Sequence, residues 1–113
     1  MAFKIVFASH WLACLWGLRT QFASSPLQTW LATAQKCREQ AAPPGYECDD
    51  AFDIWVTSFY FTVATITSVG YGDVRAYEHS TGEQALATFI MLTGAIVWGH
   101  ALANFCSVRC NGR

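Results

Sequence analysis

The chain has 113 residues, which is at most one domain. Hydrophobic residues make up 53% of it and charged residues only 13%, which argues against intrinsic disorder and against an ordinary soluble domain. The net charge of −1 excludes the basic surface that nucleic-acid binding requires.

The first uncharged run extends from Ile5 to Leu18. As a helix it would reach about 21 Å, less than the roughly 30 Å of a hydrocarbon core. Three interpretations compete: a buried helix of a soluble protein, a signal peptide, and a spanning helix whose beginning is missing. Trp11, Trp16 and His10 lie inside the run, and no clear cleavage site ends it, which disfavours the signal peptide. We expect a truncated outer helix at about residues 2–19, so that the chain is a piece of a longer protein.

A polar segment follows, the predicted turret at residues 20–50. Residues Gln28–Gln40 could form a short amphipathic helix, and Pro43-Pro44-Gly45 would end any helix at that point. Cys37 and Cys48 also lie here. In an extracellular turret they are candidates for a disulfide, and their spacing alone does not decide between pairing and free thiols.

The third apolar piece is predicted as a helix at about residues 51–66. Asp50 and Asp53 suit its beginning, because carboxylates are favoured by the free N–H groups at a helix N-terminus. Ala51 to Ile66 would reach about 24 Å, too short to cross a bilayer and return. We therefore expect a re-entrant pore helix, whose non-helical exit is covered by protein or water.

Residues 67–73 read Thr-Ser-Val-Gly-Tyr-Gly-Asp and form the predicted filter. A dehydrated potassium ion needs oxygens in place of water, and a ring of backbone carbonyls from four chains can supply them. Alternate residues must then take dihedrals of opposite hand, which glycine allows at alternate positions. The alternative is an ordinary Gly-Tyr-Gly-Asp turn, but its place after an apolar helix and between two membrane runs favours a filter. The predicted ion-binding residues are Thr67, Ser68, Val69, Gly70, Tyr71 and Gly72, with potassium held by Ser68, Val69, Gly70 and Tyr71. The Tyr71 ring is expected to pack against the pore-helix aromatics Trp55, Phe59 and Tyr60.

The second uncharged run, Gln84 to Val108, is long enough to span a membrane, and we expect the inner helix at about residues 83–109. Gly94 and Gly99 are candidate gating hinges, since glycine lowers helix stability by about 1 kcal/mol relative to alanine. Close helix packing through small residues is an equally good explanation of both glycines.

The whole arrangement resembles the pore module of tetrameric potassium channels. Residues 68–72 are similar to the family's T-V-G-Y-G, with serine in place of threonine. Residues 10–16 and 59–62 resemble the ether-à-go-go-type and cyclic-nucleotide-gated-type subfamily, as does the spacing of Gly94 and Asn104. The resemblance implies that Asp73 lies at the outer mouth, with a simple loop acid as the alternative. The resemblance does not imply that voltage or a cyclic nucleotide gates this chain.

We therefore predict an all-α membrane protein with a single pore domain over residues 1–113. Two transmembrane helices flank a re-entrant pore helix and filter loop, and three further subunits complete a tetramer. The expected function is passive, selective potassium conduction; the alternatives are a non-conducting or regulatory truncated subunit and a non-selective cation channel.

No nucleophile–base pair, zinc-ligand spacing or Walker-type phosphate loop is visible, so we expect no enzyme and no cofactor, with potassium as the permeant ligand. The acidic middle and the basic Lys4 and Arg109 near the ends predict that both termini are cytoplasmic. Arg19 fits that orientation less well. Membrane lipid is the expected surrounding, in a multi-pass protein of the plasma membrane.

Overall fold

The computed structural model of the chain describes residues 2–112. Met1 and Arg113, the two ends of the predicted domain, lie outside the described residues. Four α-helices, two short 3-10 helices and one hairpin follow in this order: α1 (Ala2–Leu18), η1 (Arg19–Phe22), η2 (Pro26–Gln28), α2 (Trp30–Thr33), β1 (Cys37–Glu39), β2 (Tyr46–Cys48), α3 (Ala51–Ile66) and α4 (Thr81–Asn111).

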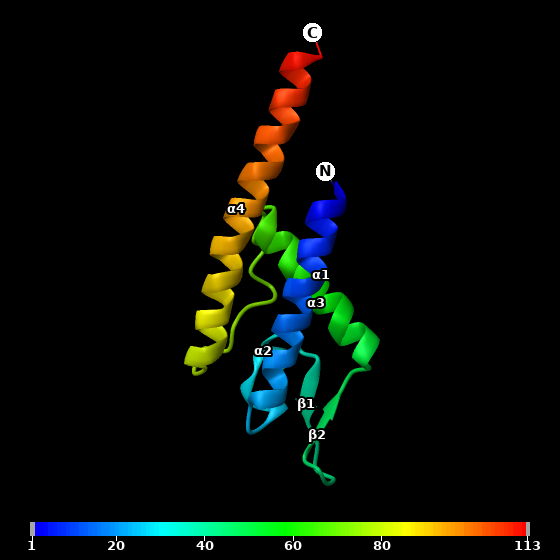
Figure 1. The fold of residues 1–113 in the computed structure, drawn as a ribbon. Coiled ribbons are helices and arrows are strands. Elements are labelled where there is room, and N and C mark those ends of the chain that lie inside the picture. The colour runs from blue at the N-terminus through cyan, green and yellow to red at the C-terminus, as the bar shows by residue number, and fades with distance from the viewer. Residues whose placement is uncertain (1, 113) are drawn as a thin grey trace.

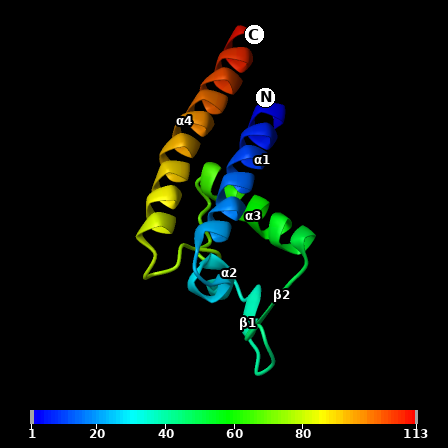
Figure 2. The same cartoon turned by 60° about the horizontal axis from the view of Figure 1, so that its bottom comes forward.

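The molecule is elongated, with extents of 65 × 26 × 21 Å. Helices α1 and α4 run alongside each other, and α3 crosses them obliquely (Figure 1). The ends of α1 and α4 that carry the two termini lie at one end of the molecule, and α2 with the hairpin lies at the other (Figures 1 and 2). The turret and the termini are therefore separated along the long axis.

The three long helices begin and end close to the predicted positions. Helix α3 has the predicted bounds, with Asp50 as its N-cap residue and Asp53 in its first turn. Helix α4 has 31 residues and is the one helix among residues 2–112 that is long and apolar enough to cross a membrane. Helix α1 has 17 residues, or about 26 Å, so a second spanning helix stays a prediction.

The expected helix over Gln28–Gln40 is wrong. Only Trp30–Thr33 is α-helical, because Gln35 takes a positive φ of 59° and the Lys36 N–H turns back to the Leu31 carbonyl. The chain then enters the β1–β2 hairpin, and Pro43 to Gly45 lie in its connecting loop. The fold is thus mostly helical, with a two-stranded sheet that the sequence did not predict.

The core lies where the turret meets helices α1 and α3. The Trp16 side chain of α1 is fully buried between two aromatic rings: its ring centroid is 4.5 Å from that of Phe61 in α3 and 5.8 Å from that of Trp30 in α2. The Trp30 indole N–H also donates to the Trp16 carbonyl at 3.3 Å. This stack joins α1, α2 and α3 near the end of the molecule opposite the termini.

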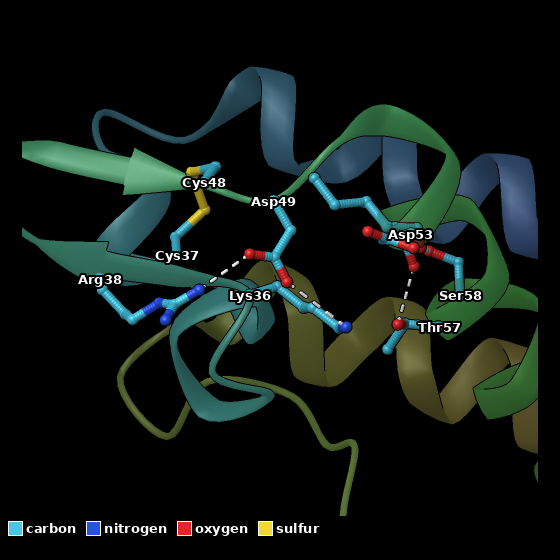
Figure 3. Close-up of polar contacts among 9 residues, drawn as sticks. Lys36, Cys37, Arg38, Cys48, Asp49, Asp53, Thr57 and Ser58 are labelled. Atoms are coloured by element: carbon cyan, nitrogen blue, oxygen red, sulfur yellow. Dashed lines mark hydrogen bonds and ion pairs between the residues drawn. A yellow bond between two sulfur atoms is a disulfide. The ribbon is translucent and has the colours of Figure 1, made fainter.

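A disulfide closes the base of the hairpin. Cys37 and Cys48 are register partners and their sulfurs are bonded (Figure 3). Beside them, Asp49 accepts ion pairs from Arg38 at 2.9 Å and Lys36 at 3.5 Å. Cys37 is buried in the core cluster, so the bridge fixes the hairpin to the aromatic stack.

We expect the disulfide to stabilise the folded turret. Because the bond closes a loop of 11 residues in sequence separation, its loss should lower the free energy of unfolding by about 3 kcal/mol. Denaturant unfolding of the double variant Cys37→Ser, Cys48→Ser measures this loss. Mass spectrometry of an unreduced digest should show the two linked peptides.

The control is Cys14→Ser, which removes an exposed free thiol of α1 and should leave stability unchanged. Alkylation of both Cys37 and Cys48 without reduction, in protein made in an oxidising compartment, would contradict the pairing.

Candidate ion-binding site

The predicted filter loop leaves α3 through a tight turn. The N–H groups of Thr67 and Ser68 donate to the carbonyls of Val63 and Thr65, at 3.0 and 3.2 Å. Those of Val69 and Gly70 both donate to the Ala64 carbonyl, at 2.9 and 3.1 Å. The loop N–H groups therefore satisfy the last carbonyls of the helix, which would otherwise lack partners. Within residues 2–112, no protein donor reaches the carbonyl oxygens of 67–72, so these oxygens remain available to a ligand.

The backbone of the loop alternates in hand. Ser68, Gly70 and Gly72 have φ values of 63°, 57° and 81°, whereas Val69 and Tyr71 are not among the positive-φ residues. The sequence predicts this alternation at the two glycines. It did not predict Ser68, because a residue with a Cβ resists positive φ by roughly 1–2 kcal/mol.

The loop is uncovered in the single chain. Val69 is 53% and Tyr71 72% exposed, and Gly70 and Gly72 are exposed as well. The Tyr71 ring stacks on Tyr60 of α3, with centroids 6.3 Å apart and planes 4° from parallel. Trp55 and Phe59 were also expected to contact Tyr71, but within the chain they stack on each other at 5.4 Å. Only Tyr60 of the three expected aromatics supports the loop from its own subunit.

Asp73 is held at the end of the loop by both carboxylate oxygens. Oδ2 accepts a hydrogen bond from the Tyr60 hydroxyl at 2.9 Å, and Oδ1 accepts one from the Val74 N–H at 3.0 Å. Tyr60 therefore touches the loop twice, through its ring at Tyr71 and through its hydroxyl at Asp73. The sequence pointed to Tyr60 as a packing aromatic only; nothing in its pattern indicated the hydrogen bond.

A cavity of about 370 Å³ lies beside the loop. Among its lining residues are 70–73 of the loop, Ala64 and Thr65 near the end of α3, and Gln84, Thr88 and Met91 of α4. The loop is thus backed by both the pore helix and the inner helix, with open space between them.

The two candidate hinge glycines differ in their surroundings. A Cβ at Gly94 would lie 3.0 Å from the Ile66 Cα and 3.1 Å from its Cγ1, closer than most real Cβ contacts. Gly94 therefore allows α4 to pack against the last residue of α3. A Cβ at Gly99 would meet nothing within 4 Å, so packing within the chain does not explain that glycine.

Residues 2–112 contain no group of three or more His, Cys, Asp or Glu side chains arranged to hold a metal ion. That the backbone carbonyls of the loop and the Ser68 hydroxyl bind an ion stays a prediction. That no cofactor binds stays a prediction.

Comparison with known proteins gives concordant matches. Residues 40–108 match the family model described as "Ion channel". The chain is 30% identical over 109 residues to the potassium voltage-gated channel unc-103 of Caenorhabditis elegans, covering 88% of this chain and 12% of that protein. It is 27% identical over 107 residues to the potassium channel AKT3 of Oryza sativa subsp. japonica, covering 95% of this chain and 11% of that protein.

A third similar protein is the voltage-gated inwardly rectifying potassium channel KCNH2 of Rattus norvegicus, 26% identical over 104 residues, covering 88% of this chain and 9% of that protein. The chain thus spans only about a tenth of the length of the curated relatives it matches. The matched segment includes the second strand β2 of the hairpin, helix α3, the loop at 67–73 and most of α4, but not β1.

Proposed function

Because the chain belongs to the ion channel family whose model matches residues 40–108, we propose that it forms a potassium-selective pore with residues 68–72 as its filter. Four copies surround one axis, since a single chain cannot close a ring of carbonyls. The relatives it resembles are named as potassium channels, which agrees with the type of ion proposed.

The observation that carries the proposal is the alternating hand of the loop backbone at Ser68, Gly70 and Gly72. Alternation of this kind turns successive carbonyls toward the same side. Such a row of oxygens, repeated four times, replaces the hydration shell of a potassium ion without any charged ligand. Thr67 and the Ser68 hydroxyl lie at the inner end of the row, next to the end of α3.

Asp73 then lies at the outer mouth of the pore. Its carboxylate is fixed by Tyr60 and Val74 rather than free in a flexible loop. Four such carboxylates form an acidic ring that raises the local concentration of cations before they enter the filter.

The proposed membrane arrangement follows the long axis of the molecule. Helix α4 spans the bilayer as the inner helix, α1 spans it as the outer helix, and α3 enters and stops as the pore helix. A 17-residue α1 is shorter than the hydrocarbon core by roughly 4 Å, which local thinning can absorb at a fraction of a kcal/mol per Å. The proposed pore domain is a single unit, and its turret is the segment at residues 20–50 between α1 and α3.

We place both termini on the cytoplasmic side and the turret outside. The helix ends near the termini share one end of the molecule and carry Lys4 and Arg109, in agreement with the excess of basic residues in cytoplasmic segments (Figure 1). The disulfide at Cys37 and Cys48 lies at the opposite end and suits an oxidising, extracellular side. The plasma membrane is the proposed residence.

Lipid and three further subunits are the proposed partners. Large apolar side chains remain exposed on α4: Phe89, Met91, Leu92, Ile96, Leu102, Phe105 and Val108. A bilayer or neighbouring copies can cover such a surface, whereas water would not be favourable beside it. The cavity beside the filter offers space for side chains of the adjacent subunit.

Reversal potentials test the proposal. In oocytes or planar bilayers, current through the channel should reverse at a voltage that follows the potassium gradient when sodium replaces potassium on one side. The parent membrane without the protein is the control. Equal permeability to sodium and potassium would favour the non-selective cation channel instead.

A further inference from the structure

Glu83 is an acidic side chain that the pore proposal leaves without a role, and its surroundings are unusual. It lies in the first turn of α4 and is only 1% exposed. A buried carboxylate is costly unless hydrogen bonds compensate for lost water, so its partners should reveal what it does.

Both oxygens of Glu83 accept backbone hydrogen bonds from other elements. Oε1 accepts from the N–H of Trp30 at 3.1 Å, and Oε2 accepts from the N–H of Tyr77 at 2.8 Å. Trp30 begins the turret helix α2, whereas Tyr77 belongs to the exit loop, residues 74–80, which connects the filter to α4. One carboxylate therefore joins the turret, the exit loop and the inner helix.

This use of Glu83 departs from the local role that its position suggests. Ser80-Thr81-Gly82-Glu83 has the spacing of a capping box, in which the glutamate would bind the N–H of the N-cap serine. The Ser80 hydroxyl does accept from the Glu83 N–H at 3.4 Å, but the Ser80 N–H donates to the Tyr77 carbonyl instead. The side chain is thus directed away from its own helix to residues up to 53 positions distant.

The elements that Glu83 joins are connected to the filter region by packing and hydrogen bonds. The Trp30 ring stacks on Trp16, which stacks on Phe61 of the pore helix. The turret also contacts the exit loop directly, because the Thr33 hydroxyl shares its proton between the Trp30 carbonyl at 2.8 Å and the Arg75 carbonyl at 3.0 Å. A Cβ at Gly82 would collide with the Arg19 guanidinium, so the first residue of η1, directly after α1, is packed on the same turn of α4.

We propose that Glu83 is a positioning residue that sets the outer end of the filter by holding the exit loop against the turret. Its two acceptors keep Tyr77 at a fixed distance from Trp30, and therefore keep the chain that follows Asp73 from shifting relative to the pore helix. The inference rests on the proposed function, since it assigns Glu83 a part in potassium binding at residues 68–72.

The test measures potassium affinity separately from fold stability. The purified chain in lipid-containing micelles is unfolded by heat at increasing KCl, with NaCl keeping the ionic strength constant. Ions that bind only the folded filter stabilise it by an amount that grows with the logarithm of one plus the ratio of ion concentration to dissociation constant. The dependence of the unfolding midpoint on KCl therefore yields an apparent potassium dissociation constant.

Glu83→Gln has nearly the same shape but replaces one acceptor with an NH₂ donor, so one buried N–H loses its partner. We expect it to raise the apparent potassium dissociation constant by about tenfold. The matched control is Glu78→Gln, the same change in the exit loop, where the carboxylate is exposed and makes only a 3.7 Å surface ion pair with Arg75. It should leave the constant unchanged. Glu83→Asp keeps both acceptors on a shorter side chain and should give an intermediate constant.

A Glu83→Gln protein with a lower midpoint at every KCl concentration but an unchanged constant would overturn the inference, because Glu83 would then serve stability alone. If Glu83→Gln yields no folded protein, a constant for Glu83→Asp equal to that of the parent overturns it as well. A parent chain whose midpoint does not distinguish potassium from sodium would contradict the proposed pore itself, and the inference with it.

Discussion

Replacing Gly70 with alanine should abolish potassium conduction while leaving the helices folded. Gly70 has a φ of 57°, and a Cβ there would meet no atom within 4 Å, so backbone conformation rather than space makes the glycine necessary. This conformation costs an alanine residue roughly 1–2 kcal/mol more than a right-handed one. In a tetramer, each of the four loops would carry this cost. Relaxation to negative φ would turn the adjoining carbonyl away from the axis. Potassium current, or flux from loaded vesicles, measures the loss.

Gly17→Ala is the matched control for Gly70→Ala. Gly17 lies in α1, and its added Cβ would be 3.8 Å from the Ser58 hydroxyl oxygen, an ordinary contact in a helix that alanine favours. This variant should conduct like the parent. Parental current from Gly70→Ala would mean that the alternating backbone of the loop is not needed for conduction.

Trp16→Ala should have the largest effect on stability. The side chain is fully buried and its ring stacks on both Phe61 and Trp30, so truncation leaves a large cavity between α1, α2 and α3. Large-to-small changes of this kind cost about 3–5 kcal/mol, which approaches the whole stability of many domains. Chemical or thermal unfolding in lipid-containing micelles measures the decrease.

The comparison is Trp11→Ala, which makes the same chemical change on the same helix where the side chain is 59% exposed. Its effect should be much smaller, because no cavity forms. Equal destabilisation by the two variants would show that the aromatic stack of Trp16, Trp30 and Phe61 is not the core of the protein.

Helix α3 and the loop at 67–73 were the most predictable parts of the molecule. Ala51–Ile66 is bounded by two aspartates on one side and by the glycine alternation on the other, so local chemistry marks both ends. The φ values at Gly70 and Gly72 follow the same local rule, because only glycine adopts that region at little cost.

The turret could not be predicted in the same way, because its conformation depends on residues distant in sequence. Helix α2 stops after Thr33, where the hydroxyl binds the Arg75 carbonyl 42 positions away. The hairpin depends on Cys37 and Cys48 meeting in register. Glu83 had a visible signal, the capping-box spacing with Ser80, but that signal indicates a local cap and not a link to Trp30.

Helix α1 begins earlier than the uncharged run in the sequence. The uncharged run begins at Ile5, but the helix already begins at Ala2 and includes Lys4 in its first turn. A long lysine side chain can reach the membrane interface from inside a helix end. Hydropathy therefore underestimates the helix at a charged end.

The central claim is that the carbonyls of residues 68–71 bind dehydrated potassium ions on a four-fold axis. The most direct measurement is to locate the ions, by determining the structure of the assembled protein in lipid with rubidium or thallium in place of potassium. The account predicts a row of strong density on the axis, level with the carbonyls of Ser68, Val69, Gly70 and Tyr71, which disappears in sodium alone. Density elsewhere only, or identical density in sodium, would contradict it.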